Sequence, residues 1–191
     1  MSDFAVTRRE PSLGWWGMAM FIAAEITLFG VMIATYFYLR FKNLQWPPHG
    51  IHGPKLAVPL VLLGVLLATS VPMQLALRAA HARRLSAVRS FLVVALIVQA
   101  GYFAMQVHLY RDDLHQFAPT DHAYASIYYT LLGTDHAHVF LGLLFDVWLL
   151  GKLARGLTTY RLNATGAIVL YWHAVNAITL AITLTIVSGA L

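Results

Sequence analysis

Hydrophobic stretches separated by short polar segments recur five times along the chain. Each stretch exceeds the roughly 20 residues that an α-helix needs to cross the hydrocarbon core of a bilayer. The pattern predicts an all-α fold, a polytopic membrane helix bundle in which a single transmembrane domain occupies residues 1–191. The five predicted transmembrane helices are residues 14–41, 56–77, 90–110, 123–150 and 164–190.

The second predicted helix contains a proline deep in its interior. Pro72 lacks the backbone N–H that an α-helix uses, and it therefore predicts a kink within residues 56–77. Residues 42–55 are rich in proline and glycine and are predicted to form a loop. The basic segments 78–89 and 151–163 are predicted to be loops as well.

Composition agrees with an integral membrane protein and excludes several other classes. Hydrophobic residues make up 59% of the 191 residues and charged residues 11%, with a mean hydropathy of +0.67. A soluble domain carries about 25% charged residues. The chain has no cysteine, which excludes disulfides and thiolate metal sites. The net charge of +5 is interpreted through its distribution across the membrane, and no nucleic-acid partner is predicted.

The basic residues are distributed unequally between the two predicted sides of the membrane. Nine of the 13 Lys and Arg residues fall in the N-terminal segment, the 78–89 region and the 151–163 loop, and four fall on the opposite side. Basic residues favour the cytoplasmic side. We therefore expect a cytoplasmic N-terminus and, because the number of predicted helices is odd, a C-terminus on the opposite side.

Glu25 is the one charged residue between Gly14 and Leu39. A helix over these residues places Glu25 about 17 Å from the helix start, near the membrane midplane. A carboxyl group at this depth must be neutral, paired or hydrated, and it is interpreted as functional. The alternative is a protonated carboxyl that bonds a neighbouring helix and serves the structure alone.

A second polar group lies within the predicted helix 123–150. His136 and His138 are two positions apart and point about 200° apart on a helix, so they cannot bind one metal ion together. Asp135, His138 and Gly142 share one face, and we predict that Asp135 is the partner of His138. No metal site is predicted, because zinc needs three or four convergent ligands and no second matching cluster is found.

The last predicted helix carries His173 and Asn176, three positions apart on one face. Helix geometry places His173 about 15 Å from the inner side, at a depth similar to those of Glu25 and His138. These residues can therefore fall in one intramembrane polar layer. Two interpretations stay open: interhelical hydrogen bonds worth about 0.6–2 kcal/mol each, and a role in handling protons or binding lipid head groups.

Several short motifs follow one another in the order and spacing of a known family. They are Phe21-Ile22-Ala23-Ala24-Glu25 with Phe29 and Tyr36-Phe37, Gln106 with Tyr110, Tyr124-Ala125-Ser126 with Tyr128-Tyr129, the set Gly133, His138, Val139 and Gly142, and Tyr171-Trp172-His173. Taken together, these motifs resemble subunit III of the haem–copper oxidases, the family of cytochrome c oxidases and quinol oxidases. The resemblance runs from about Trp15 to the end of the chain and matches the five-helix form of the subunit.

The chain departs from the family pattern at four positions. Asp135 stands where the family has a histidine, and Asn176 stands where it has an aspartate. Thr179 replaces a usual tryptophan, and Leu109 replaces the glutamate expected before Tyr110. These departures leave open a related branch of the family, which accompanies nitric oxide reductases.

The resemblance implies a non-catalytic accessory subunit of a respiratory terminal oxidase, an oxidoreductase and translocase complex of a bacterial inner membrane. Haem and copper then belong to partner subunits, and the chain packs on the catalytic subunit I beside subunit II. The family holds phospholipid in a cleft between the first two of these helices and the rest, and it supports proton uptake and durable catalysis.

By position, the resemblance makes Glu25 the buried carboxyl and makes His138 and His173 the intramembrane histidines. Asp135 is a feature of this chain, and we add it to the proton-related residues. The implied lipid head-group ligands are basic residues near the inner interface: Arg78, Arg83, Arg84, Arg155 and Arg161.

A membrane cytochrome is the alternative from another functional class. Two histidines on neighbouring helices at one depth are enough to hold haem b. The candidate ligands are His108, His136, His138 and His173. A visible absorbance spectrum of the isolated chain distinguishes this alternative from an accessory subunit.

Overall fold

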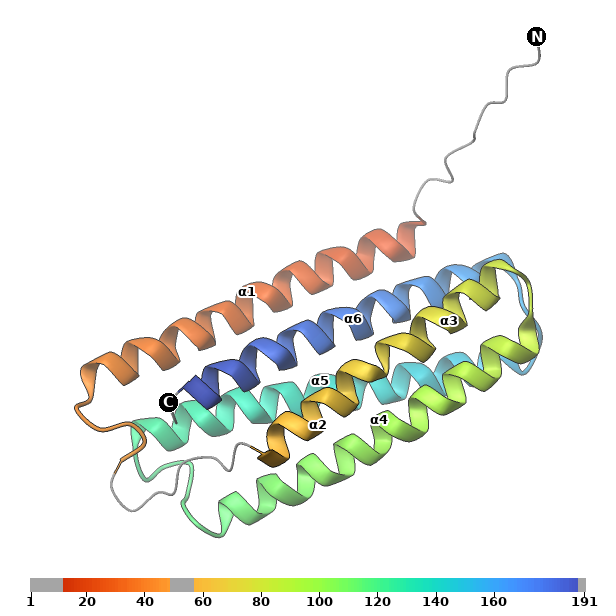
Figure 1. Cartoon of the computed structure of the whole chain (residues 1–191). Helices are drawn as coiled ribbons and strands as arrows, with labels where there is room; N and C mark the ends of the chain where they lie inside the picture. Colours follow the sequence, from red (N-terminus) through yellow and green to blue (C-terminus); the bar gives the residue numbers. More distant parts are fainter. Residues whose placement is uncertain (1–11, 49–56, 189–191) are drawn as a thin grey trace.

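The computed structural model describes residues 12–48 and 57–188, which form a bundle of long α-helices (Figure 1). The helices are α1 (Leu13–Lys42), α2 (Ala57–Ala68), α3 (Ser70–His81), α4 (Leu85–Leu114), α5 (Ala123–Leu153) and α6 (Thr159–Ser188). Because α2 and α3 form one continuous span, the described residues contain five segments long and apolar enough to cross a membrane. The predicted all-α bundle with five transmembrane helices is confirmed.

A short break separates α2 from α3 at Thr69, three positions before Pro72. A proline ring clashes with the carbonyl group four residues earlier and offers it no N–H. That residue is Ala68, the last of α2. The Thr69 hydroxyl donates to the carbonyl oxygen of Leu66 at 2.6 Å and closes the end of α2. The interruption expected from Pro72 is therefore present as a break in the helix at Thr69.

The helices extend beyond the hydrophobic stretches that predicted them. Between α3 and α4 only residues 82–84 are not helical, and between α5 and α6 only residues 154–158. The predicted loops at 78–89 and 151–163 were therefore wrong in extent. Charged residues mark where a helix leaves the hydrocarbon, but Arg and Lys are good helix formers and allow the helix to continue into the interface.

Helix α6 lies at the centre of the bundle, and α1 is its most peripheral span. α6 packs against α1, α2, α3 and α5, and 50% of its most hydrophobic window is buried, compared with 11% for α1. α1 contacts only α5 and α6 among the described helices. The expected lipid cleft needs the first two spans to stand apart from the other helices as a pair. They do not form such a pair, because α6 lies between α1 and α3 (Figure 1).

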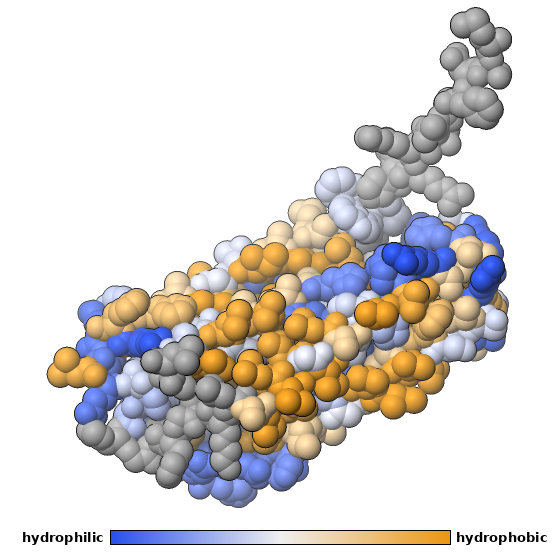
Figure 2. Space-filling view, viewed as in Figure 1, coloured by the Kyte–Doolittle hydropathy of each residue, from blue (hydrophilic) through white to orange (hydrophobic). Residues whose placement is uncertain are grey.

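Different segments of the chain lie at the two ends of the bundle. The start of α1, the α3–α4 turn and the α5–α6 turn lie at one end, and the end of α6 lies at the other (Figure 1). Hydrophobic side chains cover the middle of the visible face, and hydrophilic ones gather toward the ends (Figure 2). Lys152 lies over the ring of Trp148 at 5.6 Å, and Lys42 over Tyr38 at 4.7 Å. Such pairs of a lysine and an aromatic ring are typical of the two membrane interfaces.

Candidate functional site: an intramembrane polar network

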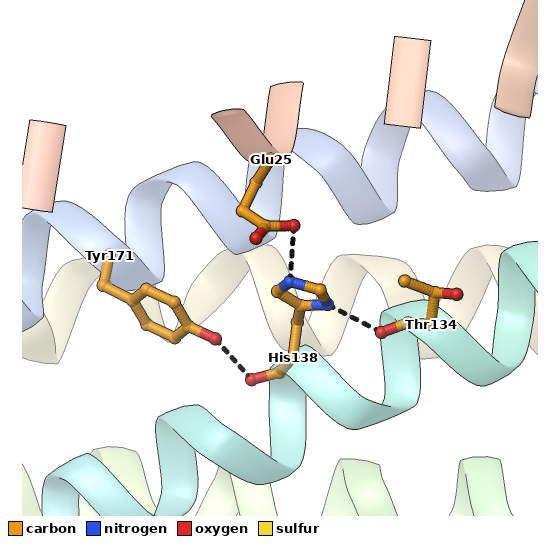
Figure 3. A network of polar contacts seen from close by, with 4 residues as sticks. All are labelled: Glu25, Thr134, His138 and Tyr171. Atoms are coloured by element: carbon orange, nitrogen blue, oxygen red, sulfur yellow. Dashed lines mark hydrogen bonds and ion pairs between the residues drawn. The ribbon is translucent and has the colours of Figure 1, made fainter. Parts of the chain in front are cut away.

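Glu25 of α1 and His138 of α5 are in direct contact in the middle of the bundle (Figure 3). Oε2 of Glu25 lies 2.8 Å from Nε2 of His138, and the two side chains are 17% and 15% exposed. Nδ1 of His138 lies 2.7 Å from the carbonyl oxygen of Thr134. The ring of Phe29 packs edge-on against the imidazole, with ring centroids 5.2 Å apart. The midplane carboxyl is thus paired across helices.

The hydrogen-bond partners determine how many protons this pair holds. The carbonyl oxygen of Thr134 can only accept, so Nδ1 of His138 carries a proton. The contact between Nε2 and Glu25 then contains one further proton, which belongs either to a neutral carboxyl or to an imidazolium. Both forms have zero net charge, which avoids the cost of an isolated charge in the membrane.

Tyr171 of α6 lies beside Glu25 on the same side of α5 and reaches the backbone of His138 (Figure 3). Its hydroxyl donates to the carbonyl oxygen of His138 at 2.7 Å. Its ring stacks with Phe21 of α1, with centroids 6.3 Å apart. α1, α5 and α6 are therefore tied together around the Glu25–His138 contact.

Asp135, the predicted partner of His138, bonds a different helix. The Thr179 hydroxyl of α6 donates to Oδ1 of Asp135 at 2.7 Å, whereas His138 faces Glu25. Side chains three positions apart are displaced by about 60° around a helix. This displacement directs Asp135 toward α6 and His138 toward α1. The predicted Asp135–His138 pair is therefore wrong.

His173 and Asn176 form a second polar group, directed toward α2 and α3. Nε2 of His173 lies 3.4 Å from Oε1 of Gln74. The amide of Asn176 donates to the Ser70 hydroxyl at 2.8 Å and lies 3.3 Å from the carbonyl oxygen of Leu66. The residues predicted to share one polar layer thus form two separate groups. Glu25 and His138 join α1 to α5, whereas His173 and Asn176 join α6 to α2 and α3.

Asp146 of α5 is a fully buried carboxyl outside the motifs considered above. Its Oδ2 accepts a hydrogen bond from Nε1 of Trp172 at 3.0 Å. The Gln99 amide, oriented to satisfy its neighbours, donates to the same oxygen at 2.9 Å. Asp146 follows Asp135 by about three helical turns, so the two acids share a face of α5. The sequence analysis did not single out Asp146. Its position in an apolar stretch, on the same helix face as Asp135, is the sequence feature that could have identified it.

The histidines considered as metal or haem ligands have separate partners. His138 uses both ring nitrogens within the protein, and His173 faces Gln74. His136 bonds through Nδ1 to the carbonyl oxygen of Leu132. Within residues 12–48 and 57–188, no three His, Asp or Glu side chains gather closely enough to hold a metal ion. A haem held between His138 and His173 does not fit this arrangement.

Among the predicted lipid ligands, Arg78 lines a pocket. The pocket lies between α3 and α6 and has a volume of about 360 Å³. Its other lining residues are Ser70, Val71, Gln74, Leu75 and His173. Arg161 instead donates to the carbonyl oxygen of Gly156 at 2.7 Å and is engaged in the α5–α6 turn. The remaining predicted ligands are exposed at the same end of the bundle: Arg83, Arg84 and Arg155.

Comparison with known proteins identifies relatives over most of the chain. A family model described as cytochrome c oxidase subunit III matches residues 11–188. A probable cytochrome c oxidase subunit 3 of Nocardia farcinica is 30% identical over 184 residues, which cover 91% of this chain and 89% of the relative. The cytochrome c oxidase subunit 3 of Bacillus subtilis is 28% identical, and the matched residues cover 87% of this chain and 80% of the relative. The cytochrome bo(3) ubiquinol oxidase subunit 3 of Pseudomonas aeruginosa is 26% identical, and the matched residues cover 93% of this chain and 85% of the relative.

Proposed function

The chain belongs to the cytochrome c oxidase subunit III family, and we propose how it serves as an accessory subunit of a respiratory oxidase. It is an integral membrane protein with five spans among its described residues. In this proposal it packs beside subunits I and II in a bacterial inner membrane, with its N-terminus in the cytoplasm. Haem and copper lie in those partner subunits. The names of the relatives favour an oxidase over a nitric oxide reductase.

The observation that carries the proposal is the contact between Glu25 and His138. It joins α1, the most peripheral span, to α5 through a partly buried pair with zero net charge. Interhelical hydrogen bonds of this kind are worth about 0.6–2 kcal/mol in membranes. By holding α1 in place, the pair preserves the surface offered to the catalytic subunit. The shared proton can also move between Glu25 and His138 without changing the net charge of the pair, and we propose that the pair takes part in proton uptake.

Phospholipid binding is the second part of the proposal. Arg78 at the pocket between α3 and α6 offers a planar cation for a phosphate group. Gln74 and His173 provide further polar contacts, and Val71 and Leu75 provide apolar walls for an acyl chain. We propose that the exposed arginines at the same end of the bundle strengthen this attraction by their charge.

Substitution of Glu25 tests the proposed role of the pair. Glu25→Gln keeps the size and hydrogen bonding of the side chain, so the complex is expected to assemble and to turn over. Glu25→Ala removes the partner of His138, and it should lower the yield of complex or the number of turnovers before inactivation. Met20→Ala, at a 73% exposed position of the same helix, is the control.

Two outcomes would contradict this proposal. A Glu25→Ala complex that assembles and lasts like the parent means that the pair does not support the oxidase. Complete loss of oxygen reduction in a fully assembled, haem-replete Glu25→Gln complex means that catalysis depends directly on this chain. Yield is measured by native electrophoresis, and durability by oxygen consumption until the rate decays.

A further inference from the structure

A histidine side chain caps the N-terminus of α5. The backbone N–H of Ala125 donates to Nδ1 of His122 at 2.9 Å. The first N–H groups of a helix have no partners within the helix, and a capping side chain satisfies one of them. Serine, threonine, aspartate and asparagine usually fill this position. Here the same role falls to a side chain that can gain a proton.

The direction of this hydrogen bond fixes the protonation state of the imidazole that makes it. A backbone N–H can only donate, so Nδ1 of His122 is an unprotonated acceptor and the ring is neutral. A second proton goes to Nδ1 and turns the acceptor into a donor. The imidazolium therefore cannot hold the N–H of Ala125. Its positive charge at a helix N-terminus also opposes the helix dipole.

Water cannot readily replace the lost acceptor, because Ala125 is buried. This residue is 0% exposed, and a buried N–H without an acceptor is costly. His122 itself is partly exposed, so protons from the solvent can reach it. Imidazole ordinarily changes its charge between about pH 5 and 8. The cap therefore joins a buried backbone donor to a group that titrates near neutrality.

The capped turn carries a side chain that holds the end of α1. Tyr124, in this turn, packs edge-on against Trp46, with ring centroids 5.1 Å apart. Trp46 in turn packs against Tyr36 of α1 at 5.4 Å. Phe117, in the connection between α4 and α5, lies 6.0 Å from the ring of His122 and 6.2 Å from that of Tyr124. Opening the first turn of α5 would therefore loosen the attachment of this end of α1.

Other titratable groups surround His122 in the described part of the chain. Asp121 precedes it and accepts a backbone hydrogen bond within the connection at 2.7 Å. Tyr124 contacts the imidazole, with ring centroids 6.0 Å apart. Asp113 of α4 accepts from the Tyr128 hydroxyl at 2.6 Å. Because protonation of Asp113 would weaken another contact of α5, a test must separate its effect from that of His122.

We propose that His122 is an acid-sensitive helix cap. The neutral imidazole holds the N–H of Ala125 and keeps the first turn of α5 packed against Trp46. The imidazolium releases this N–H, and the turn opens. In the proposed orientation of the chain, the cap lies on the side opposite the cytoplasm, and this sidedness alone rests on the proposed function. The attachment of α1 at that end then responds to the acidity of that side.

Hydrogen exchange of the intact complex in lipid nanodiscs, at about pH 7.5 and about pH 5.5, tests the proposal. Protection factors correct for the pH dependence of intrinsic exchange and are compared for residues 123–126 and 36–46. In the parent, protection of residues 123–126 should fall about fivefold at the lower pH, and that of residues 36–46 should fall with it. His122→Asn keeps a capping acceptor that does not titrate, so protection should stay high at both pH values. His122→Ala should show low protection at both.

Two matched controls separate His122 from its neighbours. His115→Ala removes an exposed imidazole from the same connection. Asp113→Asn removes the carboxylate but keeps an oxygen that accepts from Tyr128. Both variants should respond to pH as the parent does.

Three outcomes would overturn the proposal: equal protection of the parent at both pH values, a pH response that persists in His122→Asn, and loss of the response in Asp113→Asn. The parent and Asp113→Asn decide the question if His122→Asn does not assemble. Assembly is measured separately by native electrophoresis, so failure of the acid-sensitive cap leaves the accessory role intact.

Discussion

Gly142 of α5 lies directly against the indole of Trp172 of α6. A Cβ atom at position 142 would lie 2.6 Å from Cζ2 of Trp172. The indole is 0% exposed and its Nε1 donates to Asp146, so it has little freedom to move aside. The close approach of α5 to α6 therefore depends on the absence of a side chain at position 142. Packing at small residues is a main source of helix association in membranes.

Gly142→Ala should destabilise the bundle. Overpacking of a tight core costs about 1–3 kcal/mol, and here the strain falls on a buried tryptophan. Gly101→Ala is the control, because nothing lies within 4 Å of a Cβ at that position. Unfolding of the purified chain in increasing denaturing detergent measures the difference. Equal unfolding midpoints for Gly142→Ala and Gly101→Ala would show that α5 and α6 can move apart to admit the extra methyl group without loss of stability.

Glu25 and His138 should be energetically coupled. In a double-mutant cycle with Glu25→Ala and His138→Ala, we expect a coupling energy of about 0.6–1.7 kcal/mol. Pairing Glu25→Ala with His136→Ala provides the control, because His136 bonds Leu132 instead. Additive effects of Glu25→Ala and His138→Ala would contradict the contact seen in Figure 3.

Asp135 should be coupled to Thr179 and less strongly to His138. Thr179→Val removes the hydroxyl that donates to Asp135 at 2.7 Å. After that change, Asp135→Ala should cost less than it does in the parent, because the hydrogen bond is already lost. The same unfolding measurement applies. A larger coupling between Asp135→Ala and His138→Ala would restore the pair suggested by helix periodicity.

Asp146 should tolerate asparagine but not leucine. Asn keeps an oxygen that accepts from Nε1 of Trp172. Leu leaves both this group and the Gln99 amide without an acceptor, at a cost of about 1–3 kcal/mol per buried group. The midpoint of unfolding in detergent is compared for the two variants. A leucine variant as stable as the asparagine variant would mean that the acid is not needed to satisfy its neighbours.

The unequal distribution of basic residues predicts the orientation of the chain. A reporter fused before Met1 should be cytoplasmic, and one fused after Leu191 should be on the opposite side. Reporters active on opposite sides of the membrane, such as a fluorescent protein and a phosphatase, measure this. A cytoplasmic reporter after Leu191 is incompatible with five spans and a cytoplasmic N-terminus.

The sequence by itself determined the class of fold and the number of spans. In a bilayer every backbone polar group must be satisfied within the chain, so a long apolar stretch becomes a helix whatever its neighbours are. The break near Pro72 follows from the same local chemistry, because a proline deep in a helix removes a backbone hydrogen bond and clashes with the preceding turn. The helix ends were less predictable, since polar residues at the interface are compatible with helix and loop alike.

The tertiary structure alone decided which polar residues meet. Helix periodicity places Asp135 and His138 on roughly one face, yet α5 has α6 on one side of that face and α1 on the other. The 60° between neighbouring side chains, about one sixth of a turn, is enough to give them different partners. Which helices become neighbours depends on matching surfaces such as Gly142 and Trp172. This fit depends on the surfaces of two helices together, so the sequence pattern of either helix alone does not predict it.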